Sequence, residues 1–353
     1  MTFQRSLILG IGLLALVLGS GTLGAAPKKK AAASDDQPDN YKGAIVMDAA
    51  SGRVLFEKSA DNVSPPASMT KLMTFAVLHD CIASGNLSLS TPITATAADT
   101  RMGGTQVWLK EGEIFPVEEL LYAVMIQSAN DAAHALARTA AGSVDAFVAR
   151  MNDKARELGM TRTTFRTPHG LPPSNRNVAE GDLTSPRDFA LLSRHLVTHT
   201  DILKYTIRQR SFGAPNRVQL VDMVNHNHLL GKVAGVDGLK TGFTAGAMYC
   251  LAATAQRDQR RVIVVVMGSP TWKERDLKVI ELLEKGFAQI PVGSSTFVAQ
   301  ASGYAKPAAD SPFASAPLSH TEKATNEATP AQATPKADEP MIRLNVPPAK
   351  KSR

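Results

Sequence analysis

Three short groups of polar residues could together perform nucleophilic catalysis. In the first, Ser68 and Lys71 stand three residues apart before an apolar run, so on a helix they would share one face. A serine hydroxyl needs a neighbouring base at neutral pH, and a lysine can serve once burial or a nearby cation lowers its pKa. Alone this pair is weak evidence. Such a spacing arises by chance about once in a chain of this length, and an N-cap serine with a solvated lysine would explain it better.

The second group is Ser128-Ala129-Asn130, at the junction of two helical stretches predicted for 117–127 and 131–140. At such a junction a hydroxyl can relay a proton and an amide can hydrogen-bond to a bound peptide. Ordinary helix capping by Ser and Asn is the alternative, and for this group alone it would be preferred.

The third group is Lys240-Thr241-Gly242. On a strand edge, Lys240 and Thr241 can bind a carboxylate through charge and hydroxyl, and Gly242 leaves room for an extended substrate. A turn that enters a strand is the alternative explanation.

The three groups follow one another in a fixed order, and each falls on the element that the chemistry needs: a helix start, a helix junction and a strand edge. This combination resembles the signature of penicillin-binding proteins and serine β-lactamases. Within that superfamily the chain is similar to D-alanyl-D-alanine carboxypeptidases of low molecular mass. The resemblance covers about 41–290 and rests on five segments: 67–74, 127–133, 167–171, 184–188 and 236–242.

The resemblance implies a serine-type carboxypeptidase that removes the terminal D-alanine from peptidoglycan stem pentapeptides. Lys71 would take the proton from Ser68 as its hydroxyl attacks, and Ser128 would pass a proton to the departing D-alanine. β-Lactams would then act as covalent inhibitors at Ser68, and no cofactor is implied.

The resemblance also assigns substrate-binding roles. Asn130 would hold the acyl chain, and Lys240 and Thr241 the terminal carboxylate, with Gly242 allowing the substrate to lie along the strand. The backbone N–H groups of Ser68 and Phe243 would stabilise the oxyanion.

Two departures from the family pattern bear on this interpretation. Phe243 stands where many carboxypeptidases carry His, and related D-alanyl-D-alanine endopeptidases, which cut cross-links, can also show Phe there. His226 stands between two Asn residues where the family often has Arg or Thr, and we interpret it as a buried structural histidine. His226 and His228 lack a third ligand, so no metal site is expected.

Two further functions share the three groups. A β-lactamase needs a base that activates water for deacylation, and the surroundings of Glu180, the acid in the 160–185 segment, do not match that role. A non-catalytic penicillin-fold binding protein would not need the reactive side chains, and all of them are present in this sequence. Both are weaker alternatives than the endopeptidase.

The elements that must position these residues follow from apolar periodicity. A strand hairpin is predicted at 44–56, helices dominate from 67 to 200, and strands return at 218–224, 248–255 and 262–267 before a final helix at 272–287. The continuous apolar run at 262–267 is typical of a central, doubly covered strand. Strands at both ends predict an α+β fold of the β-lactamase/transpeptidase type: one antiparallel sheet flanked by helices, with an inserted helical subdomain.

The ends of the chain differ from this catalytic domain, which we place at 41–290. Residues 1–25 resemble a signal peptide, 26–40 a polar linker and 291–353 a disordered Pro/Ala-rich tail. We therefore expect an exported, periplasmic or extracellular protein. The tail offers no amphipathic anchor, so stable membrane attachment is not expected. Although the net charge is +7, residues 31–290 hold 28 basic and 27 acidic residues, which argues against nucleic acid as a partner.

Overall fold

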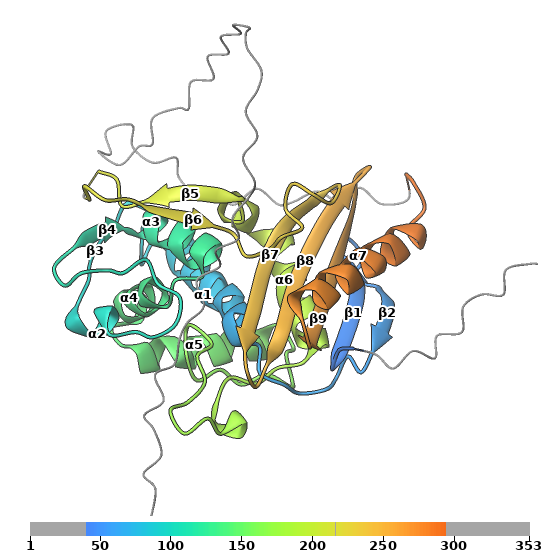
Figure 1. Cartoon of the computed structure of the whole chain (residues 1–353), viewed down its shortest axis with the longest axis horizontal. Helices are drawn as coiled ribbons and strands as arrows, with labels where there is room; N and C mark the ends of the chain where they lie inside the picture. The colour runs from blue at the N-terminus through green and yellow to red at the C-terminus, as the bar shows by residue number, and fades with distance from the viewer. Residues whose placement is uncertain (1–39, 216, 294–353) are drawn as a thin grey trace, which may run out of the picture. The chain divides into compact units, whose positions relative to one another are not determined.

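The computed structural model describes residues 40–215 and 217–293, and a five-stranded antiparallel sheet forms the centre of this part (Figure 1). Its strand order is β2-β1-β9-β8-β7. The first two strands precede the helices and the other three follow them, so the sheet is assembled from both ends as the sequence predicted. The strands are β1 (Gly43–Asp48), β2 (Val54–Lys58), β7 (Val236–Thr244), β8 (Met248–Arg257) and β9 (Arg260–Ser269).

The central strand β9 is buried along its whole length, as its apolar run predicted. Its side chains alternate between two hydrophobic clusters. Val262, Val264 and Val266 pack under α7 (Trp272–Ala288). Ile263 and Val265 face the larger cluster shared with α6 (Pro186–His199) and the remaining helices. One sheet is therefore covered on both faces, which confirms the predicted α+β architecture.

Helices and two small hairpins fill the chain between β2 and β7. Ser143 and Ser185 cap α5 and α6 by accepting backbone hydrogen bonds from Ala146 and Asp188, as predicted. The helices are α1 (Lys71–Ala83), α2 (Ala97–Thr100), α3 (Val117–Tyr122), α4 (Asn130–Ala141), α5 (Val144–Glu157) and α6, with single turns η1 (Ala67–Thr70), η2 (Ala123–Gln127), η3 (Val178–Glu180) and η4 (Ile202–Tyr205). The hairpins pair β3 (Pro92–Thr94) with β4 (Ile114–Pro116), and β5 (Gln209–Phe212) with β6 (Val221–Val224).

The structure shortens one predicted strand and adds one that was not predicted. The strand expected at 218–224 begins only at Val221, because Val218 is fully exposed. Its partner β5 was missed, since only Phe212 in that strand is buried and no apolar alternation marks it. The predicted signal peptide, nearly all of the linker and nearly all of the tail lie outside the described residues. Between residues 40 and 293, leaving out residue 216, no helix has the length and apolar character needed to cross a bilayer.

Candidate active site

Ser68 lies in the single turn η1, directly before α1. The turn is strained: Ala67, the residue before the serine, has φ +48, a backbone conformation that costs a non-glycine residue about 1 kcal/mol or more. Ser68 itself is half-buried, whereas Ala67 and Met69 on either side of it are buried. The strained turn therefore keeps the hydroxyl accessible in otherwise buried surroundings.

Two glycines pack closely against the backbone of this turn. A Cβ on Gly170 would lie 2.0 Å from the carbonyl oxygen of Ala67, and a Cβ on Gly242 would lie 2.4 Å from that of Pro66. No side chain fits at either place. Gly242 was expected to make room for substrate, but its open face is filled by the nucleophile turn. The missing side chain thus allows β7 to pack against η1.

Replacing Gly170 by alanine should disrupt the site as well as the fold. The new Cβ would overlap the backbone of Ala67 at a position with φ +85, and we expect a loss of more than about 3 kcal/mol of stability. Gly85 is a matched control, because it has φ +77 and nothing within 4 Å. Gly85→Ala should cost only about 1 kcal/mol. Urea melts of both variants make the comparison, and equal losses would show that the contact with Ala67 is unimportant.

Lys71 begins α1 and is completely buried, with its amine between three oxygens. Its Nζ lies 3.1 Å from the Oγ of Ser68, 2.7 Å from the Oδ1 of Asn130 and 2.7 Å from the carbonyl oxygen of His169. A neutral amine has two hydrogens and one lone pair. The two carbonyl-type oxygens can only accept, so they take both hydrogens. The lone pair is left for the hydroxyl of Ser68.

The electrostatics favour this neutral form. Burial lowers the pKa of Lys71 well below its usual value, and the positive charge of Lys240 lowers it further. The buried carboxyls of Asp182 and Asp131 act in the opposite direction. The predicted conditions for a lysine base, desolvation and a neighbouring cation, are thus both present.

Asn130 is the first residue of α4, and its side chain has a defined orientation. Its Nδ2 donates to the carbonyl oxygen of Gly103 at 2.7 Å, which fixes Oδ1 as the acceptor for Lys71. Ser128 is buried at the end of η2 and adopts the left-handed conformation with φ 66. The predicted helix junction is therefore a sharp turn that ends one helical stretch and starts the next.

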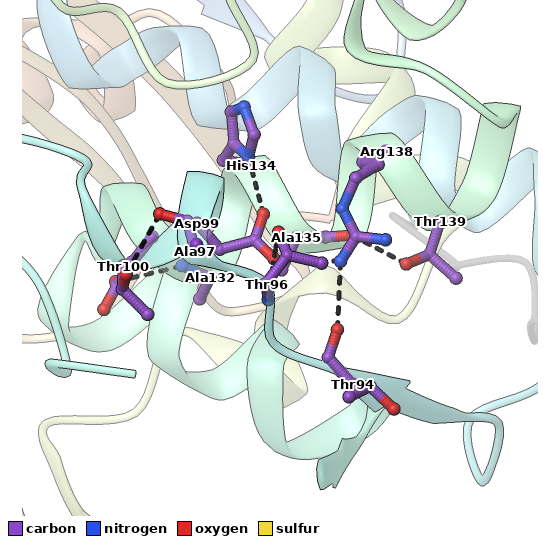
Figure 2. Close-up of polar contacts among 11 residues, drawn as sticks. Thr94, Thr96, Ala97, Asp99, Thr100, Ala132, His134, Ala135, Arg138 and Thr139 are labelled. Carbon is purple, nitrogen blue, oxygen red and sulfur yellow. Dashed lines mark hydrogen bonds and ion pairs between the residues drawn. The ribbon is translucent and has the colours of Figure 1, made fainter. Parts of the chain in front are cut away.

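A buried carboxylate, Asp99, anchors α4 (Figure 2). Asp99 pairs with the Nδ1 of His134 at 2.6 Å and accepts a hydrogen bond from Arg138 at 2.9 Å, both on α4. It also accepts from the N–H and the hydroxyl of Thr96. Although burial opposes ionisation, these partners hold the pKa of Asp99 well below its usual value. The cluster ties α2 to the helix that starts with Asn130.

Lys240 and Thr241 lie on β7, which is an edge strand of the five-stranded sheet and, among the residues described, pairs only with β8. Both side chains are buried. Burial lowers the pKa of Lys240 to about 7, and the charge of Arg275 contributes to the shift. Because burial destabilises its charged form, the ammonium of Lys240 is stabilised by an anionic partner, so this position favours binding of a carboxylate.

The structure corrects the interpretation of His226. Its side chain is exposed, and the buried residues are the two asparagines on either side of it. Asn227 donates to the carbonyl oxygen of Gly238 at 3.1 Å and so ties this segment to β7. Although His226 reaches solvent, the surrounding protein and the charge of Lys240 lower its pKa to about 4. His226 is thus a neutral neighbour of Lys240.

Sequence reasoning missed Asp182 as part of the site. This buried carboxylate accepts hydrogen bonds from the backbone of Arg166 and Thr167 and from the hydroxyls of Thr167 and Thr70. It thereby ties the loop that supplies the His169 carbonyl to the nucleophile turn. A single Asp in a polar loop carries no periodic signal, so only the fold reveals this role.

Comparison with known proteins adds to this geometry. The family model described as D-alanyl-D-alanine carboxypeptidase matches residues 29–271. The chain belongs to this family of peptidases. It is 36% identical over 248 residues to the D-alanyl-D-alanine carboxypeptidase DacF of Bacillus subtilis, covering 70% of this chain and 62% of that protein. It is 38% identical over 296 residues to DacC of Escherichia coli, covering 81% and 70%. The chain thus spans less than two thirds of DacF.

A solved structure of a penicillin-binding protein agrees with the fold. Penicillin-binding protein D2 of Listeria monocytogenes in its ampicillin-bound form matches with a TM-score of 0.62 and 32% identity. The match covers 70% of this chain and 98% of that one. The family resemblance and the fold class that the sequence predicted are confirmed.

Proposed function

We propose that this protein is a serine-type D-alanyl-D-alanine carboxypeptidase. It removes the terminal D-alanine from stem pentapeptides through an acyl-enzyme on Ser68. The observation that carries the proposal is the buried amine of Lys71, which is 3.1 Å from Ser68 Oγ and has two fixed acceptors for its own hydrogens. This arrangement supplies the base that an ordinary serine lacks.

In the first step the hydroxyl of Ser68 attacks the carbonyl carbon of the penultimate D-alanine, and its proton passes to Lys71. The backbone N–H groups of Ser68 and Phe243 stabilise the oxyanion, a contribution of about 3 kcal/mol for one donor. The C–N bond then breaks, and Ser128 passes a proton to the leaving amine. Water attacks the resulting ester and releases the shortened peptide. Asn130 holds the acyl chain.

Lys240 and Thr241 bind the free carboxylate of the departing D-alanine, so the enzyme should require that group. A peptide with an amidated C-terminus should show a kcat/KM lower by roughly ten- to a hundred-fold, because Lys240 is left buried without an anionic partner. The difference in kcat/KM between the free acid and the amide should be smaller in Lys240→Met, because this variant offers neither substrate a positive charge. An amide that reacts as fast as the free acid would contradict this binding mode.

The two lysines should also shape the pH profile. Lys71 must be neutral, so activity rises as the pH increases through its lowered pKa. Lys240 must be charged to bind a carboxylate, and its pKa of about 7 means that this charge is lost as the pH rises further. We expect kcat/KM for the free acid to fall above about pH 7 and the amide to lack that decline. If kcat/KM fell equally at alkaline pH for both substrates, Lys240 would not be the group that binds the carboxylate.

A D-alanyl-D-alanine endopeptidase is the second candidate, and one observation favours it. Phe243 is 55% exposed and its ring packs at a tilt against that of Tyr249, so this position offers a substrate carboxylate no side-chain donor. A weaker carboxylate site would tolerate the larger leaving group of a cross-link. An endopeptidase would cleave cross-linked dimers faster than free pentapeptides.

The remaining expectations are proposals of the same kind. The catalytic domain at 41–290 acts on peptidoglycan stem peptides in the periplasm or outside the cell, after removal of residues 1–25. β-Lactams acylate Ser68 because their strained amide takes the place of the D-Ala-D-Ala bond. Neither nucleic acid nor a cofactor is required.

A further inference from the structure

A cavity of about 470 Å³ adjoins the nucleophile turn. Its walls come from the turn itself (Pro65 and Ala67), from the loop at 170–182 and from the end of β7 with the turn after it (244–246). Aliphatic, proline and glycine residues make up most of this lining. The volume and the apolar character are those of a small-molecule site, and none of the proposed catalytic side chains forms part of the wall.

The position of the cavity along β7 indicates which part of the substrate reaches it. The carboxylate site at Lys240 and Thr241 comes first, the oxyanion donor Phe243 follows, and the cavity begins at Thr244. A peptide bound along this strand by its C-terminus therefore extends its preceding residues toward the cavity. From Thr241 to Thr244 the strand rises about 10 Å, which is also the length of three extended residues. The third residue from the substrate's C-terminus thus arrives at the cavity.

Two charged residues line this cavity, Arg176 and Asp182. Asp182 is buried, and its oxygens already accept four hydrogen bonds from Thr70, Arg166 and Thr167. Arg176 is exposed, and within 40–215 and 217–293 its guanidinium has neither a hydrogen bond nor an ion pair. The available charge in the cavity is therefore positive.

The loop that carries Arg176 is organised by Glu180. The carboxylate of Glu180 accepts hydrogen bonds from the side chains of Asn175 and Asn177 at 2.7 Å each. Between them, Arg176 has φ +58, and its N–H donates to the carbonyl oxygen of Pro173 at 2.8 Å. The backbone at Arg176 is thus held in place where the residue lines the cavity.

We propose that this cavity binds the side chain of the third residue of the stem peptide, and that Arg176 selects a diamino dicarboxylic acid such as diaminopimelate over lysine. Both side chains have an aliphatic stem that fits the apolar wall. Both also end in an ammonium, which the guanidinium of Arg176 repels. Only the diamino dicarboxylic acid carries a carboxylate beside that ammonium, and this carboxylate can pair with the guanidinium. This inference rests on the proposed function, since it assumes that the peptide ends at Lys240.

The test uses two pentapeptides that differ only in their third residue, meso-diaminopimelate or L-lysine. Release of D-alanine is measured as kcat/KM for the full chain and for Arg176→Met, which keeps an unbranched stem without the charge. The control is Arg166→Met, because Arg166 lies in the same segment, is exposed and does not line the cavity. We expect the wild-type protein to prefer the diaminopimelate peptide about tenfold. Arg176→Met should lose that preference, and Arg166→Met should keep it.

Three other results would overturn the inference, and they differ in what they leave standing. A wild-type protein that releases D-alanine from both peptides equally well refutes the selection and preserves the proposed function. If Arg176→Met lowers kcat/KM equally for both peptides, Arg176 binds a carboxylate that the two substrates share and does not select the third residue. Failure to release D-alanine from either peptide refutes the proposed function as well. Acylation of Arg176→Met by penicillin at the wild-type rate verifies that the variant has an intact site.

Discussion

Lys71→Arg should reduce the rate of acylation by about a thousandfold or more, although the positive charge is retained. A guanidinium has a pKa above about 12 and cannot accept the proton of Ser68. In the folded protein burial and the charge of Lys240 lower the pKa of the Lys71 amine, which favours its neutral form, and arginine cannot reproduce that state. The rate at which a fluorescent penicillin labels the protein measures the effect.

Lys240→Arg is the matched control, since it makes the same substitution at the other buried lysine of the site. A carboxylate site needs charge rather than proton exchange, so this variant should react much faster than Lys71→Arg. Thermal melts of both variants separate a loss of chemistry from a loss of folding. Near wild-type labelling of a folded Lys71→Arg protein would eliminate Lys71 as the base.

Ser68→Ala should abolish the covalent adduct and lower peptide turnover by about 10⁴-fold or more, because the acyl-enzyme cannot form. The change removes one half-buried hydroxyl and leaves the strained turn at Ala67 in place. The melting temperature should therefore change little. Mass spectrometry of the penicillin-treated protein should find the adduct on the peptide containing Ser68.

Ser128→Ala provides the comparison for this experiment. Ser128 is proposed to transfer a proton and not to form a bond to carbon, so its variant should still form the adduct, at a lower rate. An adduct that persists in Ser68→Ala, or that maps to Ser128, would show that the nucleophile was assigned wrongly.

The sequence predicted the elements that carry a strong local signal. The apolar run at 262–267 became the central strand β9, and the capping serines Ser143 and Ser185 begin helices as expected. The three polar groups fall on a turn before a helix, a helix junction and an edge strand. Each of these depends on residues close together in the chain, which is why local patterns sufficed.

Contacts between distant segments could not be predicted. The carbonyl oxygen of His169 accepts a hydrogen bond from Lys71 because the fold brings its loop to the site. Every residue has such an oxygen, so the residue type at position 169 could not predict this contact. Asp182 accepts a hydrogen bond from Thr70, which lies 112 residues earlier in the chain. The packing of Gly242 against the nucleophile turn, where a Cβ would overlap Pro66, is likewise invisible in the residue type. His226 was expected to be buried, but alternation along its segment turns it outward.

We infer that the geometry around Ser68, Lys71 and Lys240 serves removal of a C-terminal D-alanine. Product analysis after incubation of the purified protein with a free pentapeptide and with a cross-linked dimer distinguishes this activity from cleavage of cross-links. We predict that the pentapeptide becomes a tetrapeptide, with release of D-alanine, at a higher kcat/KM than the dimer is opened, and that Ser68→Ala does neither. Faster conversion of dimers into monomers would contradict the carboxypeptidase assignment and establish the endopeptidase in its place.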